Sequence, residues 1–507
     1  MRPEDIEEDQ QVEGMRTRQA EFFKNRRRDF LQRDITKQRL QTIDNSAFAN
    51  ISLKLTHLTS YRDEGLVRNI IEWLQLPREP AKLDEFLSAV ESKEISKQHF
   101  GMIGLRKILT EYSNWVIQYV IDRNVLSAIL GLLSSEHLHL RLEAAWCVAN
   151  LSNGTSAQTA CIVRKNGLPL LLEVSQSPFP QIAEQAVWAL GNIIGDSPEF
   201  RQLALRLGIV TLLAGRFANS ELALKKIVLW VFASLCKQRA PKEPLKELEP
   251  ALRVLVQGIV DGLPETSEEI EDTVEALARM VCKKTLDSLI NPPLFAKLKE
   301  YFDASLAGKL PPAVASHCNA IFGSVASGEA KHVDLLLDAG LLDSFAQALQ
   351  NDSELWASEV CWILSNIALS DERQVAKLLE RKTLMQGVLA LIASNGEDKS
   401  SEALWVVCNF CKVKNSILLN QIFELGLLNI FHTILKDNVE QKCSLVLEAL
   451  NYLLDYFQNL GPEDNRLTKQ LVELGIADLI ESKQFDPSTN IYLKANLILK
   501  KYFVLEN

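Results

Sequence analysis

The sequence lacks the residue patterns that catalysis or metal binding would require. Its seven histidines form no HExxH-like pair, and it contains no nucleophile with a matching base and no phosphate-binding loop. Cys408 and Cys411 have CxxC spacing, but no second cysteine pair or histidine cluster accompanies them. We therefore expect neither an enzyme nor a protein with a bound cofactor or metal ion.

Long apolar runs are also missing. No uninterrupted apolar stretch reaches the ~18 residues of a membrane-spanning helix, and the acidic start MRPEDIEEDQ lacks the apolar segment of a signal peptide. The nine cysteines are scattered, mostly inside apolar stretches, which is typical of small buried side chains in a reducing compartment. These features predict a protein of the cytoplasm or nucleus that does not insert into membranes.

The composition indicates a foldable chain with an acidic bias. Hydrophobic residues make up 47% of the 507 residues, charged residues make up 24%, and the net charge is −10. An acidic protein is a poor direct ligand for nucleic acid and a suitable one for a basic peptide.

Four pairs of tryptophan and asparagine recur at a constant spacing. Within each pair the asparagine follows the tryptophan by four residues, so that on an α-helix both side chains lie on one face. Trp188 follows Trp146 by 42 residues, and Trp405 follows Trp362 by 43. Such a period predicts a helical repeat array, in which each repeat packs only on its neighbours. The first cluster is Trp146 with Asn150 and Trp188 with Asn192; the second cluster is Trp362 with Asn366 and Trp405 with Asn409.

The same period continues through the rest of the chain, but several repeats lack the tryptophan–asparagine pair. Trp230 has Ser234 in place of asparagine, and the repeats near Glu275 and Ala320 show no Trp–Asn pair. In the repeat after Asn409, the equivalent positions are expected to be Leu447 and Asn451, so that the asparagine is kept and the tryptophan is replaced by leucine. About ten repeats are predicted, with a polar break at Pro178 and Pro180 and with helix junctions of positive φ at glycines 167, 208, 340, 426 and 475.

A tryptophan at helical spacing is normally a core residue. In the helix around Trp188, however, another set of residues already supplies an apolar face: Ala186, Val187, Leu190, Ile193 and Ile194. Trp188 and Asn192 then lie on a second face, which favours a binding role. Trp73, Trp115 and Trp356 have no asparagine four residues later and are expected to be packing residues.

The N-terminal part has a different character from the array. Residues 1–14 are acidic and predicted to be flexible, residues 15–42 are strongly basic, residues 43–65 resemble a linker, and the array is predicted over 66–507. The basic segment is either a solvated charged tail or, as we favour, an interaction arm for an acidic surface.

The stretch EQAVWALGNIIGD, together with GTSAQT after the preceding pair, resembles importin-α (karyopherin-α), and the similarity runs from about residue 15 to the C-terminus. The chain looks like a divergent member of that family. The resemblance implies an all-α, right-handed superhelical armadillo-repeat solenoid of about ten three-helix repeats, with the paired residues lining a concave groove. It further implies a nuclear import adaptor that binds basic nuclear localisation signals in an extended conformation, links cargo to importin-β and shuttles between cytoplasm and nucleus. The export receptor with Ran-GTP would be a further partner of the C-terminal repeats.

The resemblance also assigns residues to sites. Asp196 would receive a lysine ammonium, Thr159 would assist it, and the indoles would hold aliphatic stems of Lys or Arg. The major site would comprise Trp146, Asn150, Thr159, Gln185, Trp188, Asn192, Asp196 and Trp230; the minor site Glu359, Trp362, Asn366, Glu402, Trp405 and Asn409, with Asn451 at its edge; and the importin-β-binding arm Arg16, Arg18, Arg27, Arg28, Lys37 and Arg39.

Two departures from the family pattern stand out. Ser234 removes an amide from the major site, and Gln38 interrupts the basic triplet that in the family acts as an autoinhibitor. The alternative function is an armadillo scaffold that uses the same groove for a partner unrelated to import.

Overall fold

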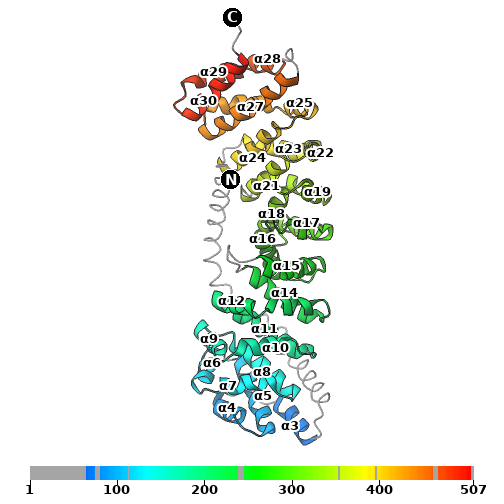
Figure 1. Ribbon diagram of the computed structural model, residues 1–507, viewed down its shortest axis with the longest axis vertical. Helices are drawn as coiled ribbons and strands as arrows, with labels where there is room; N and C mark the ends of the chain where they lie inside the picture. The colour runs from blue at the N-terminus through cyan, green and yellow to red at the C-terminus, as the bar shows by residue number, and fades with distance from the viewer. Residues whose placement is uncertain are drawn as a thin grey trace. The chain divides into compact units, whose positions relative to one another are not determined.

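The computed structural model describes residues 64–74, 80–111, 113–237, 245–282, 284–289, 291–351, 354–393, 397–460 and 466–503. Over these residues the chain forms helices and no strand, arranged as successive helical groups (Figure 1). The all-α repeat prediction is therefore confirmed. The predicted acidic start, basic arm and nearly all of the linker lie outside the described residues. The described residues fall into two compact units, which divide between Ile227 and Val228.

In the first unit, the long helices α5, α8 and α11 pack on one another in sequence order. A shorter helix precedes each of them and packs on it, α4 on α5, α7 on α8 and α10 on α11. The helix α14 begins in this unit and ends in the next. The elements are α3 (Glu64–Leu74), η1 (Pro80–Lys82), α4 (Leu83–Val90), α5 (Ile95–Glu111), α6 (Ser113–Asp122), α7 (Leu126–Gly131), η2 (Leu132–Ser134), α8 (Leu138–Leu151), α9 (Ser156–Arg164), α10 (Gly167–Ser175), α11 (Pro180–Asp196), α12 (Pro198–Arg206), α13 (Ile209–Phe217) and α14 (Leu222–Lys237).

The second unit repeats this arrangement, with α16, α18, α21, α24, α27 and α30 packed in series. Its elements up to the second cluster are α15 (Leu245–Val260), α16 (Ser267–Met280), η3 (Leu286–Leu289), α17 (Pro292–Leu306), α18 (Pro312–Ala326), α19 (Ala330–Asp338), α20 (Leu341–Leu349), α21 (Glu354–Ile367), α22 (Glu372–Glu380), α23 (Lys382–Ile392) and α24 (Glu397–Phe410). The remaining elements are α25 (Ser416–Glu424), α26 (Leu427–Asp437), α27 (Glu440–Leu460), α28 (Arg466–Glu473), α29 (Ile476–Ser482), η4 (Lys483–Phe485), α30 (Thr489–Ile498) and η5 (Leu499–Phe503).

Aromatic side chains fill part of the core of the second unit. The Phe302 ring meets Phe322 and Phe345 edge-on at centroid distances of 5.9 and 6.0 Å, and all three rings are fully buried. Burying one such ring stabilises the fold by roughly 1.5–3 kcal/mol. Because these rings come from α17, α18 and α20, this part of the core joins neighbouring repeats.

The helix junctions follow the predicted glycines with one exception. Gly208, Gly340, Gly426 and Gly475 have φ between 71° and 92°, in the region that favours glycine. At the fifth junction it is Asn166 that has positive φ, at 61°, so the prediction for Gly167 is wrong. Gly167 is required instead by close packing, since a Cβ there would lie 2.8 Å from the Ile162 carbonyl oxygen.

Among the described helices, none is by itself long and apolar enough to cross a membrane. Two bent pairs reach that length and composition together, namely Trp115–Asp122 with Leu126–Ser134 and Ser416–Glu424 with Leu427–Asp437.

Most of the cysteine side chains are buried. All nine are free thiols, and seven of them are buried. In the CxxC stretch, burial raises the pKa of both Cys408 and Cys411, which disfavours the reactive thiolate.

Candidate functional site

One face of α11 carries four polar or aromatic side chains in a row. Gln185, Trp188, Asn192 and Asp196 follow one another by three or four residues and are all partly exposed. The other faces of the helix are buried, and Ala186, Val187, Leu190 and Ile193 are 0% exposed and Ile194 is 1% exposed. The prediction of a second, non-core face on this helix is therefore confirmed.

The asparagines of both clusters connect neighbouring long helices. The Nδ2 group of Asn192 donates to the Ala149 carbonyl at 3.1 Å and to Ser152 Oγ at 3.2 Å. In the second unit, Asn409 Nδ2 donates to the equivalent carbonyl, that of Ser365, at 3.0 Å. Each carbonyl belongs to the residue just before the asparagine of the previous repeat. The amide nitrogen is thus used to hold the helices in register, a role that the sequence did not predict.

Two asparagine side chains have a polar atom that is available to hydrogen-bond to a ligand. The Oδ1 atom of Asn409 and the Nδ2 atom of Asn366 are both buried without a hydrogen-bond partner among the described residues. A buried polar group without a partner costs about 1–3 kcal/mol. An acceptor and a donor of this kind match the N–H and C=O groups of an extended peptide backbone.

Asp196 is the last of the four residues on this face of α11, and only one of its two carboxylate oxygens has a hydrogen-bond partner among the described residues. Its Oδ1 atom accepts from Ser156 Oγ at 2.8 Å, whereas Oδ2 is buried without a hydrogen-bond partner. Burial raises the pKa of Asp196, against the hydrogen bond from Ser156. Thr159 is fully buried and directs its hydroxyl at the Ser152 carbonyl, 3.4 Å away. The site therefore offers a desolvated oxygen to a cation, and the Thr159 hydroxyl is directed at a backbone carbonyl of the chain itself.

The first Trp–Asn pair is largely covered by α5. Trp146 and Asn150 are each only 7% exposed. The Arg106 guanidinium lies over the Trp146 ring at 5.1 Å and pairs with buried Glu143, three residues before that tryptophan. Asn150 Nδ2 donates to Thr110 Oγ1 at 3.2 Å. An arginine of the chain itself therefore occupies the position that a guest cation would take on this indole.

The indoles of the second cluster are more open. Trp362 is 37% exposed and Trp405 is 38% exposed. The Trp362 ring lies directly against the backbone of α18, because a Cβ on Gly323 would be only 1.7 Å from its Cζ3 atom. Gly323 precedes Asn366 by 43 residues, so the period of the array could have identified it.

Carboxyl groups accompany the indoles of both clusters. Burial raises the pKa of Glu359 to about 7, against hydrogen bonds from Asn319 and Ser316; the Asn319 amide lies 3.0 Å from Glu359 Oε2. In the first unit, burial and then the charge of Glu221 raise the pKa of Glu184 to about 7. A positive charge nearby would lower the pKa of both carboxyl groups, because a cation favours the ionised form.

Comparisons with known proteins point to a family of helical repeat proteins. The sequence model of the Armadillo/beta-catenin-like repeat matches residues 116–153 and 155–195. Importin subunit alpha-1b of Oryza sativa subsp. japonica is 27% identical over 285 residues, which cover 55% of this chain and 52% of that protein. Importin subunit alpha-2 of Arabidopsis thaliana is 29% identical over 233 residues, covering 44% of this chain and 43% of that protein. The chain is a divergent relative of importin-α.

This importin-α relative matches the two proteins over about half of their length or less. Its fold also resembles a crystal structure of an engineered protein, with a TM-score of 0.58 at 17% identity, covering 84% of this chain and all of that one. At that identity the likeness concerns the fold alone.

In the repeat after Trp230, a residue of an ion pair stands at the position of the tryptophan. Lys237 contacts both Asp272 and Glu275, and Asp272 follows Trp230 by the period of 42 residues. Burial alone would raise the pKa of Glu275, but Lys237 and Arg279 outweigh it and lower the pKa to about 2. Trp230 and Ser234 are partly exposed. Trp230 belongs to the second unit, apart from the other residues of the predicted major site.

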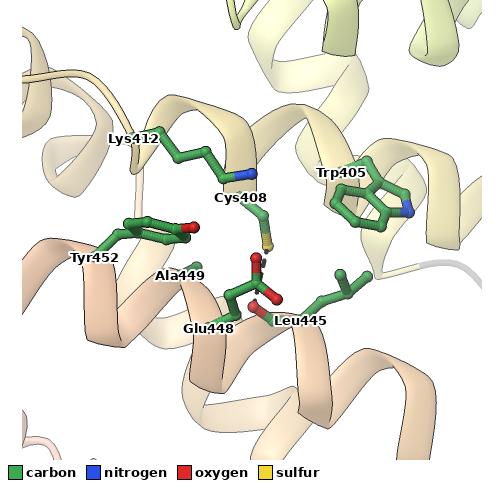
Figure 2. Close-up of a pocket in the computed structure, with 7 residues that line it drawn as sticks. All are labelled: Trp405, Cys408, Lys412, Leu445, Glu448, Ala449 and Tyr452. Carbon is green, nitrogen blue, oxygen red and sulfur yellow. Dashed lines mark hydrogen bonds between the residues drawn. The ribbon is translucent and has the colours of Figure 1, made fainter. Parts of the chain in front are cut away.

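The importin-α relative differs from the sequence prediction after Trp405. Leu447 is fully buried, and Asn451 contacts Asp455 and Tyr502. Glu448 and Tyr452 line a pocket with Trp405 instead (Figure 2). They follow Trp405 and Asn409 by 43 residues. The prediction was off by one residue, which on a helix rotates the side chain by about 100°.

Other predicted residues have mixed outcomes. Trp73 packs edge-on against Phe100 at 5.6 Å and Trp356 is 7% exposed, as expected of packing residues, but Trp115 is 50% exposed. Glu402 is partly exposed, one turn before Trp405. The arm residues Arg16, Arg18, Arg27, Arg28, Lys37 and Arg39 lie outside the described residues, and so does Gln38.

Within the part of the chain that is described, no group of three or more His, Cys, Asp or Glu side chains could hold a metal ion.

Proposed function

We propose that this importin-α relative is a nuclear import adaptor. Its long helices bind classical basic nuclear localisation signals in an extended conformation, and its basic segment, residues 15–42, links the cargo to importin-β. The protein shuttles between cytoplasm and nucleus, and its C-terminal repeats bind the export receptor with Ran-GTP. It binds neither nucleic acid nor membrane directly and catalyses no reaction.

The observation that carries this proposal is the repeated arrangement of asparagine beside indole. In both units an asparagine donates to the previous long helix, at 3.1 Å from Asn192 and 3.0 Å from Asn409. Neighbouring helices packed at about 10 Å match about three residues of extended peptide. These hydrogen bonds orient the asparagine side chains, and Asn366 Nδ2 and Asn409 Oδ1 have no hydrogen-bond partner among the described residues. A guest backbone can meet these two groups while its side chains enter the spaces between indoles.

The chemistry beside the indoles favours Lys and Arg in the guest. Asp196 Oδ2 is buried without a hydrogen-bond partner among the described residues, and burial raises the pKa of Glu359 to about 7. An ammonium or guanidinium group stabilises such carboxylates, and its aliphatic stem packs on the indole at about 0.5–2 kcal/mol per contact. The proposed sites keep the predicted residues within each unit, Trp146, Asn150, Thr159, Gln185, Trp188, Asn192 and Asp196 for the major site in the first unit and Glu359, Trp362, Asn366, Glu402, Trp405 and Asn409 for the minor site in the second. Trp230, which the sequence assigned to the major site, belongs to the second unit.

A peptide titration tests the cargo role. A fluorescent peptide with two lysine-rich clusters is titrated into the full chain, and a peptide of the same length with the lysines replaced by alanine serves as control. We expect low-micromolar or tighter binding of the first peptide and none of the second. Equal, weak anisotropy changes for both peptides would show that the protein does not recognise basic signals.

The arm needs a separate experiment. Residues 1–45, immobilised at low salt, are expected to retain importin-β, and a version with Arg27 and Arg28 changed to Glu is expected to retain less. If basic peptides bind the full chain while the arm retains no importin-β, the scaffold alternative is favoured.

A further inference from the structure

The surface next to Trp405 changes the sign of its charge within one repeat. Trp362 and Trp405 are each preceded by a glutamate three residues earlier, Glu359 and Glu402. Beyond Trp405, Lys412 enters the pocket from the turn that follows α24, and its Nζ lies 5.3 Å from the centre of the Tyr452 ring. Figure 2 shows this ammonium pointing into the space between Tyr452 and Trp405.

The carboxylate in this pocket is already paired. Lys494 on α30 approaches Glu448 Oε2 to 3.2 Å and also donates to Ser444 Oγ at 2.9 Å. Of the residues that line the pocket, Lys412 and Glu448 are charged, and Lys494 pairs with Glu448 from outside the lining. With Glu448 neutralised in this way, Lys412 is left as the positive charge of the pocket, and its contact with Tyr452 is a cation–π contact rather than an ion pair. Lys501 and Asp455 pair with each other further along and add no net charge.

The pocket therefore suits a guest group different from those at Trp362 and Trp405. The face of Tyr452 is occupied by Lys412, so a guest lysine or arginine would have to displace that ammonium and remain near Lys494. A guest carboxylate, in contrast, can pair with Lys412 without breaking the Lys494–Glu448 contact.

We propose that the pocket formed by Trp405, Lys412, Glu448 and Tyr452 binds an acidic residue of the guest peptide and makes Lys412 a specificity-determining residue. The preferred ligand of the second cluster is then a short basic segment followed, on the side that lies over α27, by Asp or Glu. The inference rests on the proposed function and adds a feature of the cargo sequence that the clusters themselves do not require.

Three peptides that differ only in their flanks test the proposal on the full chain. Each carries one Lys-Arg pair, with two Glu, two Ala or two Lys placed three residues away on both sides, so that the direction of binding does not matter. For the wild-type protein we expect the Glu-flanked peptide to bind about fivefold more tightly than the Lys-flanked one, the size expected for one or two partly exposed ion pairs.

Variants of two nearby lysines locate the effect. Lys412→Glu should reverse the preference, and the milder Lys412→Gln should weaken it without reversing it. Lys414→Glu makes the same charge change at an exposed residue that does not line the pocket, and it should leave the preference within about twofold of wild type. Circular dichroism checks that each variant is folded. Any contribution of the flanks at the first cluster is common to all these proteins.

Two results would overturn the inference. If Lys412→Glu and Lys414→Glu change the flank preference equally, the pocket has no specific role, although the proposed function stands. If the Ala-flanked peptide binds none of the proteins, the proposed function fails and the inference fails with it.

Discussion

The two clusters share one architecture but differ in what surrounds their indoles. In each, an asparagine amide donates to a carbonyl of the previous long helix, at 3.1 Å in the first unit and 3.0 Å in the second. In the first cluster, however, Arg106 covers Trp146, which is only 7% exposed, whereas Trp405 of the second cluster is 38% exposed. The same four-residue pattern thus yields a closed position in one unit and an open one in the other.

The spacing of tryptophan and asparagine therefore fixes the hydrogen bond between neighbouring long helices, but it does not fix whether the indole is open to a ligand. Whether an indole is available depends on a residue about 40 positions earlier, on the preceding long helix. There, Arg106 covers Trp146 and Gly323 supports Trp362. We therefore expect the first cluster to depend mainly on Asp196 and the second on its two exposed indoles.

The largest expected effect concerns Asp196. Replacing it by Lys removes a buried acceptor and adds a like charge, so a peptide with one lysine cluster should bind the first cluster about 100-fold more weakly, or about 3 kcal/mol. Fluorescence anisotropy of the full chain measures the loss. Glu199→Lys, the same change at an exposed residue nearby, is the control and should have little effect. Similar losses in both variants would mean that only overall charge matters.

The next effect is a pH dependence of binding. The pKa of Glu359 is raised to about 7, and a bound cation requires the ionised carboxylate. The fraction ionised increases with pH, so affinity should rise about tenfold between pH 6 and pH 8 if binding returns the pKa to its ordinary range.

Single variants separate the two clusters in this titration. Glu359→Gln should remove the pH dependence of the second cluster, and Glu184→Gln, whose carboxyl pKa is also raised to about 7, that of the first. A wild-type affinity that stays constant over this range would show that neither carboxyl takes part in binding.

A third prediction compares two tryptophans directly. Trp405→Ala should weaken peptide binding about fivefold through the lost cation–π contact, with little change in Tm. Trp146→Ala should instead lower stability, because removing a buried indole costs about 3–5 kcal/mol. Thermal unfolding and anisotropy on both variants measure the two effects. If Trp146→Ala affects binding as much as Trp405→Ala while leaving Tm unchanged, the closed and open positions are not different.

The smallest effect is expected at Gly323. An added Cβ would overlap the Trp362 ring at 1.7 Å, so Gly323→Ala must displace the indole and should reduce binding at the second cluster about threefold, within the range of one cation–π contact. The control is Gly215→Ala, since a Cβ at Gly215 meets no atom within 4 Å. Tryptophan fluorescence should shift only in the first variant. An unchanged spectrum in Gly323→Ala would contradict the close contact.

The sequence by itself determined the helical repeats, their period and the second face of α11. These properties are local or periodic: the spacing of Trp188 and Asn192 fixes their shared face, and Ala186, Val187 and Leu190 fix the buried one. The same logic identified the junction glycines, except where Asn166 adopted the positive φ in place of Gly167.

The tertiary structure decided which of these residues are available and which partners they have. Arg106 meets Trp146 across 40 residues of sequence, Gly323 supports Trp362 across 39, and Glu448 rather than Leu447 faces Trp405. Each contact joins neighbouring repeats, where a rotation of one residue position changes the face that a side chain occupies. The pattern of one helix cannot specify that rotation, because the packing of the next helix against it sets the final register.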